Sequence, residues 1–163
     1  MRRTVEIGSR ASRHEGADED VRSHDHDHAP SQTVFDYVSD FTKHGDWAGH
    51  GLQVTKDSDG PVAMGSTYST VAKQFGTQRE HSTVTELEPG RVFGWDSKGA
   101  LGTVHHRFTV AAAEGGTNLT KSAEFLDRSF LAKMTGWKIS RDLPAGLRAD
   151  VEEIKARLES PSN

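Results

Sequence analysis

The sequence predicts an α+β fold in which a long C-terminal helix covers an antiparallel sheet. From Gly51 onward, short extended stretches alternate with Gly, Pro, Asp and Ser residues, a pattern typical of strands joined by turns. Such short links cannot hold crossover helices, so neighbouring strands must run antiparallel. The last part of the chain instead repeats apolar residues every three or four positions, which is the period of a helix.

Six strands are expected after Gly51. Their predicted ranges are Leu52–Lys56, Ser66–Phe75, Thr77–Glu88, Arg91–Ser97, Gly102–Val110 and Thr117–Leu126. The turn residues that separate them include Asp57 to Pro61, Glu88-Pro89-Gly90 and Glu114-Gly115-Gly116.

An earlier strand is expected in VRSHDHDHAP, residues 21–30. As a strand, this segment places His24, His26 and His28 on one face. Two neighbouring histidines could share a zinc ion, but all three span too far for one ion, and no further ligand cluster follows. The favoured interpretation is therefore a solvated edge strand with incidental histidines, and we expect no metal and no cofactor.

Two short helical segments are expected next. SQTVFDYVSDFTKHGDW reads as a helix followed by a turn, with Ser31 as its N-cap. Its apolar side would hold Val34, Phe35, Val38 and Phe41. Residues 43–48, which contain Trp47, are expected to form a second short helix or a loop.

The C-terminal run from Arg128 to Glu159 is expected to be the long helix. Its second half has one apolar stripe, formed by Leu147, Val151, Ile154 and Leu158. Asp150 is among the residues expected on the solvent-facing side. Its first half aligns Phe130, Met134, Trp137 and Arg141 on one face. Pro144 predicts a kink or a short break between them.

Composition excludes several classes of function. The chain has no cysteine and a net charge of −4, which excludes disulfides and thiolate chemistry and argues against a nucleic-acid binder that relies on a general basic field. No apolar run approaches the ~18 residues of a membrane span. We expect a cytoplasmic protein without stable membrane insertion, with residues 1–20 as a disordered tail and 21–160 as one domain. The sequence leaves the oligomeric state open.

Five motifs, taken in order, resemble those of a known family. They are HAPSQTVFDYVSDFTKHGDW, GPVAMGSTY, VTELEPGRVFGW, HHRFTV with GGTNLT, and the long C-terminal helix. Their order and spacing resemble the START-like SRPBCC superfamily, most closely its polyketide cyclase/dehydrase and lipid-transport group, over Val21 to Glu159. The resemblance implies a helix-grip fold: a curved seven-stranded antiparallel sheet around the C-terminal helix, two short helices closing one end, and a cavity for an apolar ligand. The family shares no catalytic triad, so no catalytic residue is carried over.

Strand alternation and the family register together predict which side chains face the cavity. Inward residues would include Thr70, Ala72, Val104, Val110, Leu119, Ala123 and Phe125, with Phe130 from the helix. The predicted ligand-binding set is Tyr68, Phe93, Trp95, His106, Phe108, Lys121, Met134 and Trp137. A register error of one residue would invert the set of a whole strand.

Three charged residues depart from the family pattern at inward positions: Asp25 and Asp27 in the first strand and Lys121 in the last. These strands are neighbours in the helix-grip fold, so one hypothesis is that Asp25 or Asp27 pairs with Lys121, because a buried charge needs a partner. The alternative is a shifted or frayed first strand in which all three reach water.

The sequence thus favours a protein that binds a small hydrophobic or amphipathic ligand, lipid-like or polyketide-like, in an internal cavity. One alternative is a polyketide cyclase/dehydratase-like enzyme with His106 or Tyr68 as acid or base. Another is an interaction protein whose cavity is filled. For both His106 and Tyr68, packing or ligand orientation is the favoured role over catalysis.

Overall fold

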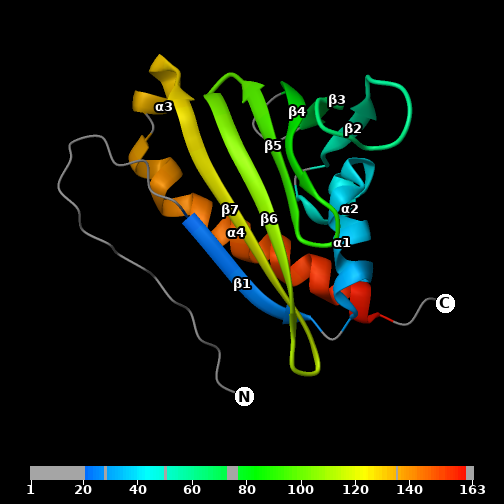
Figure 1. Ribbon diagram of the computed structural model, residues 1–163. Helices are drawn as coiled ribbons and strands as arrows, with labels where there is room; N and C mark the ends of the chain where they lie inside the picture. The colour runs from blue at the N-terminus through cyan, green and yellow to red at the C-terminus, as the bar shows by residue number, and fades with distance from the viewer. Residues whose placement is uncertain (1–20, 28, 50, 73–76, 135, 161–163) are drawn as a thin grey trace.

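One curved antiparallel sheet organises the molecule (Figure 1). The computed structural model describes residues 21–27, 29–49, 51–72, 77–134 and 136–160, without the side chains of 21–27 and 139–140. The strands follow the order β1-β7-β6-β5-β4-β3-β2. Their bounds are β1 Val21–Asp27, β2 Gln53–Lys56, β3 Thr67–Ala72, β4 Gln78–Glu88, β5 Val92–Gly99, β6 Gly102–Ala113 and β7 Gly116–Arg128. The predicted seven-stranded helix-grip fold is confirmed.

The helices lie on one face and at one end of this sheet (Figure 1). Helix α4 packs against β1 and β7, and α1 packs against β5, β6 and β7. The bounds are α1 Ser31–Ser39, the 3₁₀ helix η1 Phe41–Lys43, α2 His44–Trp47, α3 Phe130–Met134 and α4 Gly136–Glu159. The core fills the space between these helices and the sheet.

The strand predictions agree with the structure to within a few residues. The largest difference is in the β6–β7 hairpin, where β6 continues to Ala113 and β7 begins at Gly116. Gly115 has a φ of 79°, a backbone conformation that glycine adopts without strain. The turn is therefore tight, and the two strands stay paired as far as the turn. In β4 the register shifts between Val84 and Glu86, and such a bulge increases local twist and bends a strand.

Helix α1 starts differently from the prediction. Pro30 occupies the N-cap position without a side-chain cap, and Ser31 is the first helical residue. The carbonyl of Pro30 accepts from the Val34 N–H at 3.1 Å. The Ser31 cap is therefore wrong, whereas the predicted apolar side is buried: Val34, Phe35, Val38 and Phe41.

Only one of the two C-terminal stripes faces the sheet. Leu147, Val151 and Ile154 are buried, whereas Trp137 is 70% exposed. At ~100° per residue, the ten positions from Trp137 to Leu147 leave these side chains about 80° apart around a helix axis. Trp137 therefore lies at the margin of the buried face, and the second stripe, which is the longer aliphatic one, takes the core.

The predicted break at Pro144 is wrong, because α4 runs through this residue. The helical segments instead separate earlier, with α3 ending at Met134 and α4 beginning at Gly136. Proline inside a helix costs about 3 kcal/mol, and burial of the stripe that follows directly from Leu147 offsets this cost.

Within the described part of the chain, no helix combines the length and apolar character needed to cross a bilayer. The cytoplasmic location stays a prediction.

The phase of α4 predicts a contrast between two large-to-small substitutions. Leu147→Ala should lower the free energy of unfolding by about 2–5 kcal/mol, because it leaves a cavity against the sheet. Trp137→Ala should change it little, since that side chain is mostly in solvent. Urea unfolding of the full chain measures both, and equal losses would contradict the assigned phase.

Candidate functional site

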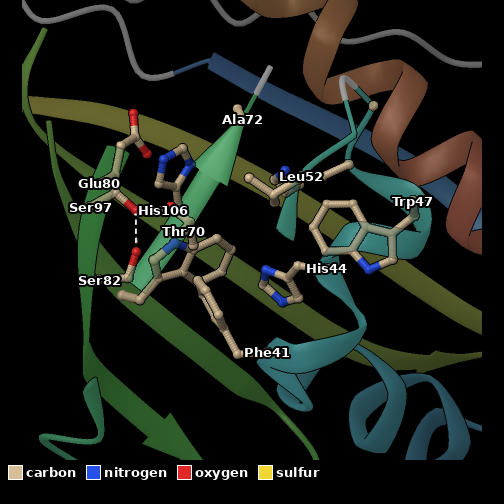
Figure 2. A pocket seen from close by; sticks show the side chains of 14 residues that line it. Phe41, His44, Trp47, Leu52, Thr70, Ala72, Glu80, Ser82, Ser97 and His106 are labelled. Atoms are coloured by element: carbon tan, nitrogen blue, oxygen red, sulfur yellow. Dashed lines mark hydrogen bonds between the residues drawn. The ribbon is translucent and has the colours of Figure 1, made fainter. Parts of the chain in front are cut away.

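A pocket of about 280 Å³ lies between the sheet and the segment from η1 to the start of β2 (Figure 2). The helical side contributes aromatic and aliphatic groups, and the sheet contributes most of the polar ones. The lining residues are Phe41, His44, Trp47, Ala48, Gly49, Leu52, Thr70, Ala72, Glu80, Ser82, Trp95, Ser97, His106 and Lys121. Mostly apolar walls with a few placed polar groups are typical of small-molecule sites.

Aromatic rings fill the space beneath this pocket. The ring of Phe41 lies edge-on to Trp95 at 5.2 Å between centroids and lies 4.6 Å from that of Tyr68. Phe93 and Phe108 are fully buried and, like Tyr68, lie outside the pocket lining. Packing of these rings restricts the hollow to one part of the helix–sheet interface.

The helical wall is held close to β2 by a glycine. A Cβ added to Gly45 in α2 would lie 2.5 Å from the backbone oxygen of Leu52, closer than real Cβ contacts allow. Glycine at this position therefore lets α2 approach the chain that leads into β2, and both segments line the pocket.

Lys121 of β7 is a buried cation with three partners. Its Nζ lies 2.5 Å from Oδ2 of Asp150 in α4. The same nitrogen lies 4.6 Å from the ring centroid of Trp47 and 5.5 Å from that of Phe108. A carboxylate and two aromatic faces thus replace the water that this ammonium group gives up.

The sequence prediction that Asp150 faces solvent is wrong. It lies three residues after Leu147 and four before Ile154, so it borders the buried stripe and reaches the sheet. The predicted partners, Asp25 and Asp27, have side chains outside the described part of the structure. The β1–β7 register pairs Ser23 with Lys121, and Asp25 with Leu119.

His44 is buried beside this cation and is neutral. Its Nε2 lies 3.0 Å from the carbonyl oxygen of Val38, and because a carbonyl only accepts, Nε2 carries the proton. Burial lowers the pKa of His44 to about 3, against the opposing effect of the Val38 bond, and the Lys121 charge adds to the lowering.

His106 stacks on Trp95, with 5.0 Å between ring centroids and 16° between planes. Burial holds its pKa well below the ordinary 6.5, and the charge of Lys121 adds to this effect. Its Nδ1 and the indole Nε1 of Trp47 are buried without a hydrogen-bond partner among the described residues. Buried polar atoms normally have partners, so a bound molecule could satisfy these two.

The opposite wall is polar. The hydroxyls of Ser82 and Ser97 bond to each other at 2.8 Å (Figure 2). Glu80 lies beside them on β4, and burial raises the pKa of its carboxyl. This wall offers hydroxyl and carboxyl groups to a ligand.

The structure divides the predicted ligand-binding residues into three groups. Trp95, His106 and Lys121 line the pocket. Tyr68, Phe93 and Phe108 face inward as predicted but lie in the core. The prediction that Met134 and Trp137 line the cavity is wrong, since they are 65% and 70% exposed; Phe130, also predicted inward, is 79% exposed. Phe130 and Met134 belong to the separate helix α3, which buries Ala132 instead, and Trp137 lies off the buried stripe of α4.

The sequence did not point to part of the helical wall, including Ala48 and Leu52, or to the polar wall with Glu80, Ser82 and Ser97. The period-2 alternation of β4 and β5 was available as a signal for the second group, because Ser82 and Ser97 follow the register of Val84 and Trp95. The one-turn helix α2 carries no such periodicity.

The family model described as polyketide cyclase/dehydrase and lipid transport matches residues 20–159. The chain belongs to this family. No curated protein sequence matches the chain.

Several solved structures share the fold of this family member. TTHA0849 from Thermus thermophilus superposes with a TM-score of 0.71 at 12% identity, over 89% of this chain and all (100%) of the other. The ZhuI aromatase/cyclase from Streptomyces sp. R1128 superposes with a TM-score of 0.66 at 16% sequence identity, over 89% of this chain and 98% of the other. The di-domain aromatase/cyclase StfQ from the steffimycin biosynthetic pathway superposes with a TM-score of 0.69 at 13% sequence identity, over 86% of this chain and 50% of the other.

The Lys121–Asp150 pair predicts an asymmetric mutational response. Asp150→Ala should cost about 3 kcal/mol of unfolding free energy, because it leaves a buried ammonium group without its carboxylate. Adding Lys121→Met should restore much of this loss. Asp142→Ala removes a carboxylate from an exposed pair with Arg141 and should change stability little. Chemical denaturation tests all three, and a harmless Asp150→Ala would contradict the pairing.

The two buried histidines predict acid sensitivity. Their pKa values lie below the unfolded value of 6.5, so below that pH the unfolded chain binds more protons. Their stabilisation is complete above about pH 6.5 and declines as the pH falls toward about 3. His44 alone should account for about 2 kcal/mol between pH 7 and pH 5. Urea unfolding across this window should show a shallower pH dependence in His44→Phe, and an unchanged slope would contradict the assignment.

Proposed function

We propose that this protein binds a small, largely apolar molecule in the pocket between the sheet and α2. The supporting observation is the pocket itself: aromatic walls combined with buried polar atoms, on Trp47 and His106, that have no hydrogen-bond partner among the described residues. The apolar body of the ligand would contact Phe41, Trp47 and Trp95, and one or two polar groups would set its orientation.

The pocket favours a ligand that has hydrogen-bonding groups and no negative charge, because the Glu80 carboxyl lines it. Lys121 is compensated by Asp150, and His44 and His106 are neutral at physiological pH because their pKa values are depressed. The volume of about 280 Å³ lies just below the ~300–1,000 Å³ of ligand pockets. A compact ring compound therefore fits this proposal better than a long-chain lipid.

A cyclase- or dehydratase-like activity is the second candidate, and His106 supports it. This histidine lines the pocket with one ring nitrogen free of protein partners among the described residues, although its strongly lowered pKa makes it a weak base. Tyr68 lies outside the pocket lining, which weakens its candidacy. The similarity to two aromatase/cyclases, both under 25% identical, supports the shared fold and leaves the reaction open.

The third alternative, a protein with a filled cavity, loses support because the core aromatics leave a hollow of this size.

Filling the pocket should abolish binding. Ala72 lines the pocket, so Ala72→Phe should exclude a ligand. Val71→Phe is the matched control, because the adjacent strand residue points to the other face. Native mass spectrometry of the full chain, followed by extraction, should detect a co-purifying small molecule in the wild type and in Val71→Phe only.

If nothing co-purifies, titration with an apolar fluorescent probe compares ligand binding by the wild type, Ala72→Phe and Val71→Phe. Equal binding of the probe to both variants, or no binding to any, would contradict the proposal. Should a ligand be found and turned over, His106→Gln separates the two candidate functions: loss of turnover with retained binding would favour the enzyme.

A further inference from the structure

A group of large apolar side chains faces solvent where β7 passes into α3 and α4. Leu126 is 54% exposed and Leu131 52%, and exposure rises to 79% for Phe130, 65% for Met134 and 70% for Trp137. We call these five residues the apolar face. Isolated exposed apolar residues are ordinary, but a group this large marks a contact surface.

The orientation of α3 makes this face unusual. The residue that α3 buries is Ala132, which is 0% exposed, while Phe130, Leu131 and Met134 point outward. A short helix stabilised only by its own domain would bury its largest apolar groups. The side chains of α3 are thus arranged for a contact outside the domain.

The charges on this segment have the opposite sign to the rest of the protein. Lys133, Lys138 and Arg141 are exposed, and Asp142 is the acidic residue of the segment 130–142, so the segment carries +2 in a chain of −4. Arg141 lies over the Trp137 ring, 5.4 Å from its centroid. Aromatic and aliphatic groups flanked by Lys and Arg are typical of helices that lie in the plane of a membrane interface.

We propose that the apolar face docks the protein on an anionic lipid bilayer as a peripheral contact. Phe130, Met134 and Trp137 would enter the headgroup–acyl boundary, and Lys133 and Lys138 would face acidic headgroups. The contact needs no membrane-spanning helix.

The pocket and the apolar face lie toward the same end of the sheet. Ser97 in the pocket lining pairs with Val104, which pairs with Phe125, the residue before Leu126. Figure 1 shows α3 beyond that end of β7. Docking through α3 would therefore bring the polar wall of the pocket toward the lipid surface, although docking itself does not depend on a pocket ligand.

Vesicle binding of the full chain tests this inference. The protein should sediment with vesicles of phosphatidylcholine mixed with phosphatidylglycerol, bind phosphatidylcholine vesicles much more weakly, and dissociate as salt is added. Trp47 and Trp95 are each 4% exposed, so the blue shift of emission and the protection from acrylamide on binding should come from Trp137. Trp137→Phe should still sediment but lose both signals.

Two variants separate the apolar and charged contributions. The pair Phe130→Ser with Met134→Ser should abolish sedimentation, whereas Met64→Ser, which changes a residue that is 60% exposed between β2 and β3, should not. Lys133→Gln with Lys138→Gln should weaken binding about 30-fold, whereas Arg91→Gln, at an exposed site beside Glu88, should have little effect. All these residues are exposed, so the variants should fold.

Three results would overturn the proposal. The first is no binding to anionic vesicles, or equal binding to neutral ones. The second is protection of Trp137 from acrylamide in the absence of lipid, which would mean that residues 1–20 or a second copy already cover the face. The third is a concentration-dependent dimer that the Phe130→Ser with Met134→Ser variant dissociates, which would assign the face to self-association.

Discussion

Helix α4 can bury one apolar stripe, and the choice of stripe governs the rest of the structure. Placing Leu147, Val151 and Ile154 against the sheet brings Asp150, at the edge of that stripe, within reach of Lys121. The same rotation leaves Trp137, in the first turn of this helix, exposed to solvent. The buried ion pair and the exposed indole are thus two results of one geometric constraint.

The buried ion pair then sets the electrostatics of the interior. Lys121 is a positive charge close to two imidazoles, and together with burial it keeps the pKa of His44 and of His106 low. Both rings therefore behave as neutral aromatic groups against Trp95: His44 meets it edge-on at 4.9 Å between centroids, and His106 stacks on it at 5.0 Å. The charge of Lys121 thus helps to keep the neighbouring imidazoles uncharged, which suits a pocket for an apolar ligand.

Much of the fold was predictable because its signals are local. Turn residues marked the strand ends, and period-2 alternation placed Leu119, Lys121, Ala123 and Phe125 inward, where all four are buried. The two stripes of the C-terminal run were also visible. The ten-residue offset between Trp137 and Leu147 shows that the two sets differ in phase, but the break between α3 and α4 that separates them has no local signal as strong as Pro144.

The candidate site was less predictable, because it depends on contacts between distant segments. The partner of Lys121 comes from a helix 29 residues later, and inward alternation does not distinguish Trp95, at the pocket, from Phe93, in the solid core. That distinction depends on where η1 and α2 stop filling the space. No local pattern in residues 41–52 encodes this.

The close approach at Gly45 has a consequence for how such pockets diverge. One wall is positioned by a backbone-to-backbone contact between α2 and Leu52, so its distance from the sheet is independent of which side chains line the hollow. Within the family, two proteins with the same lining residues would differ in ligand size if one had a bulkier residue at this position. Comparison of lining residues alone would then group proteins whose pockets accept different molecules.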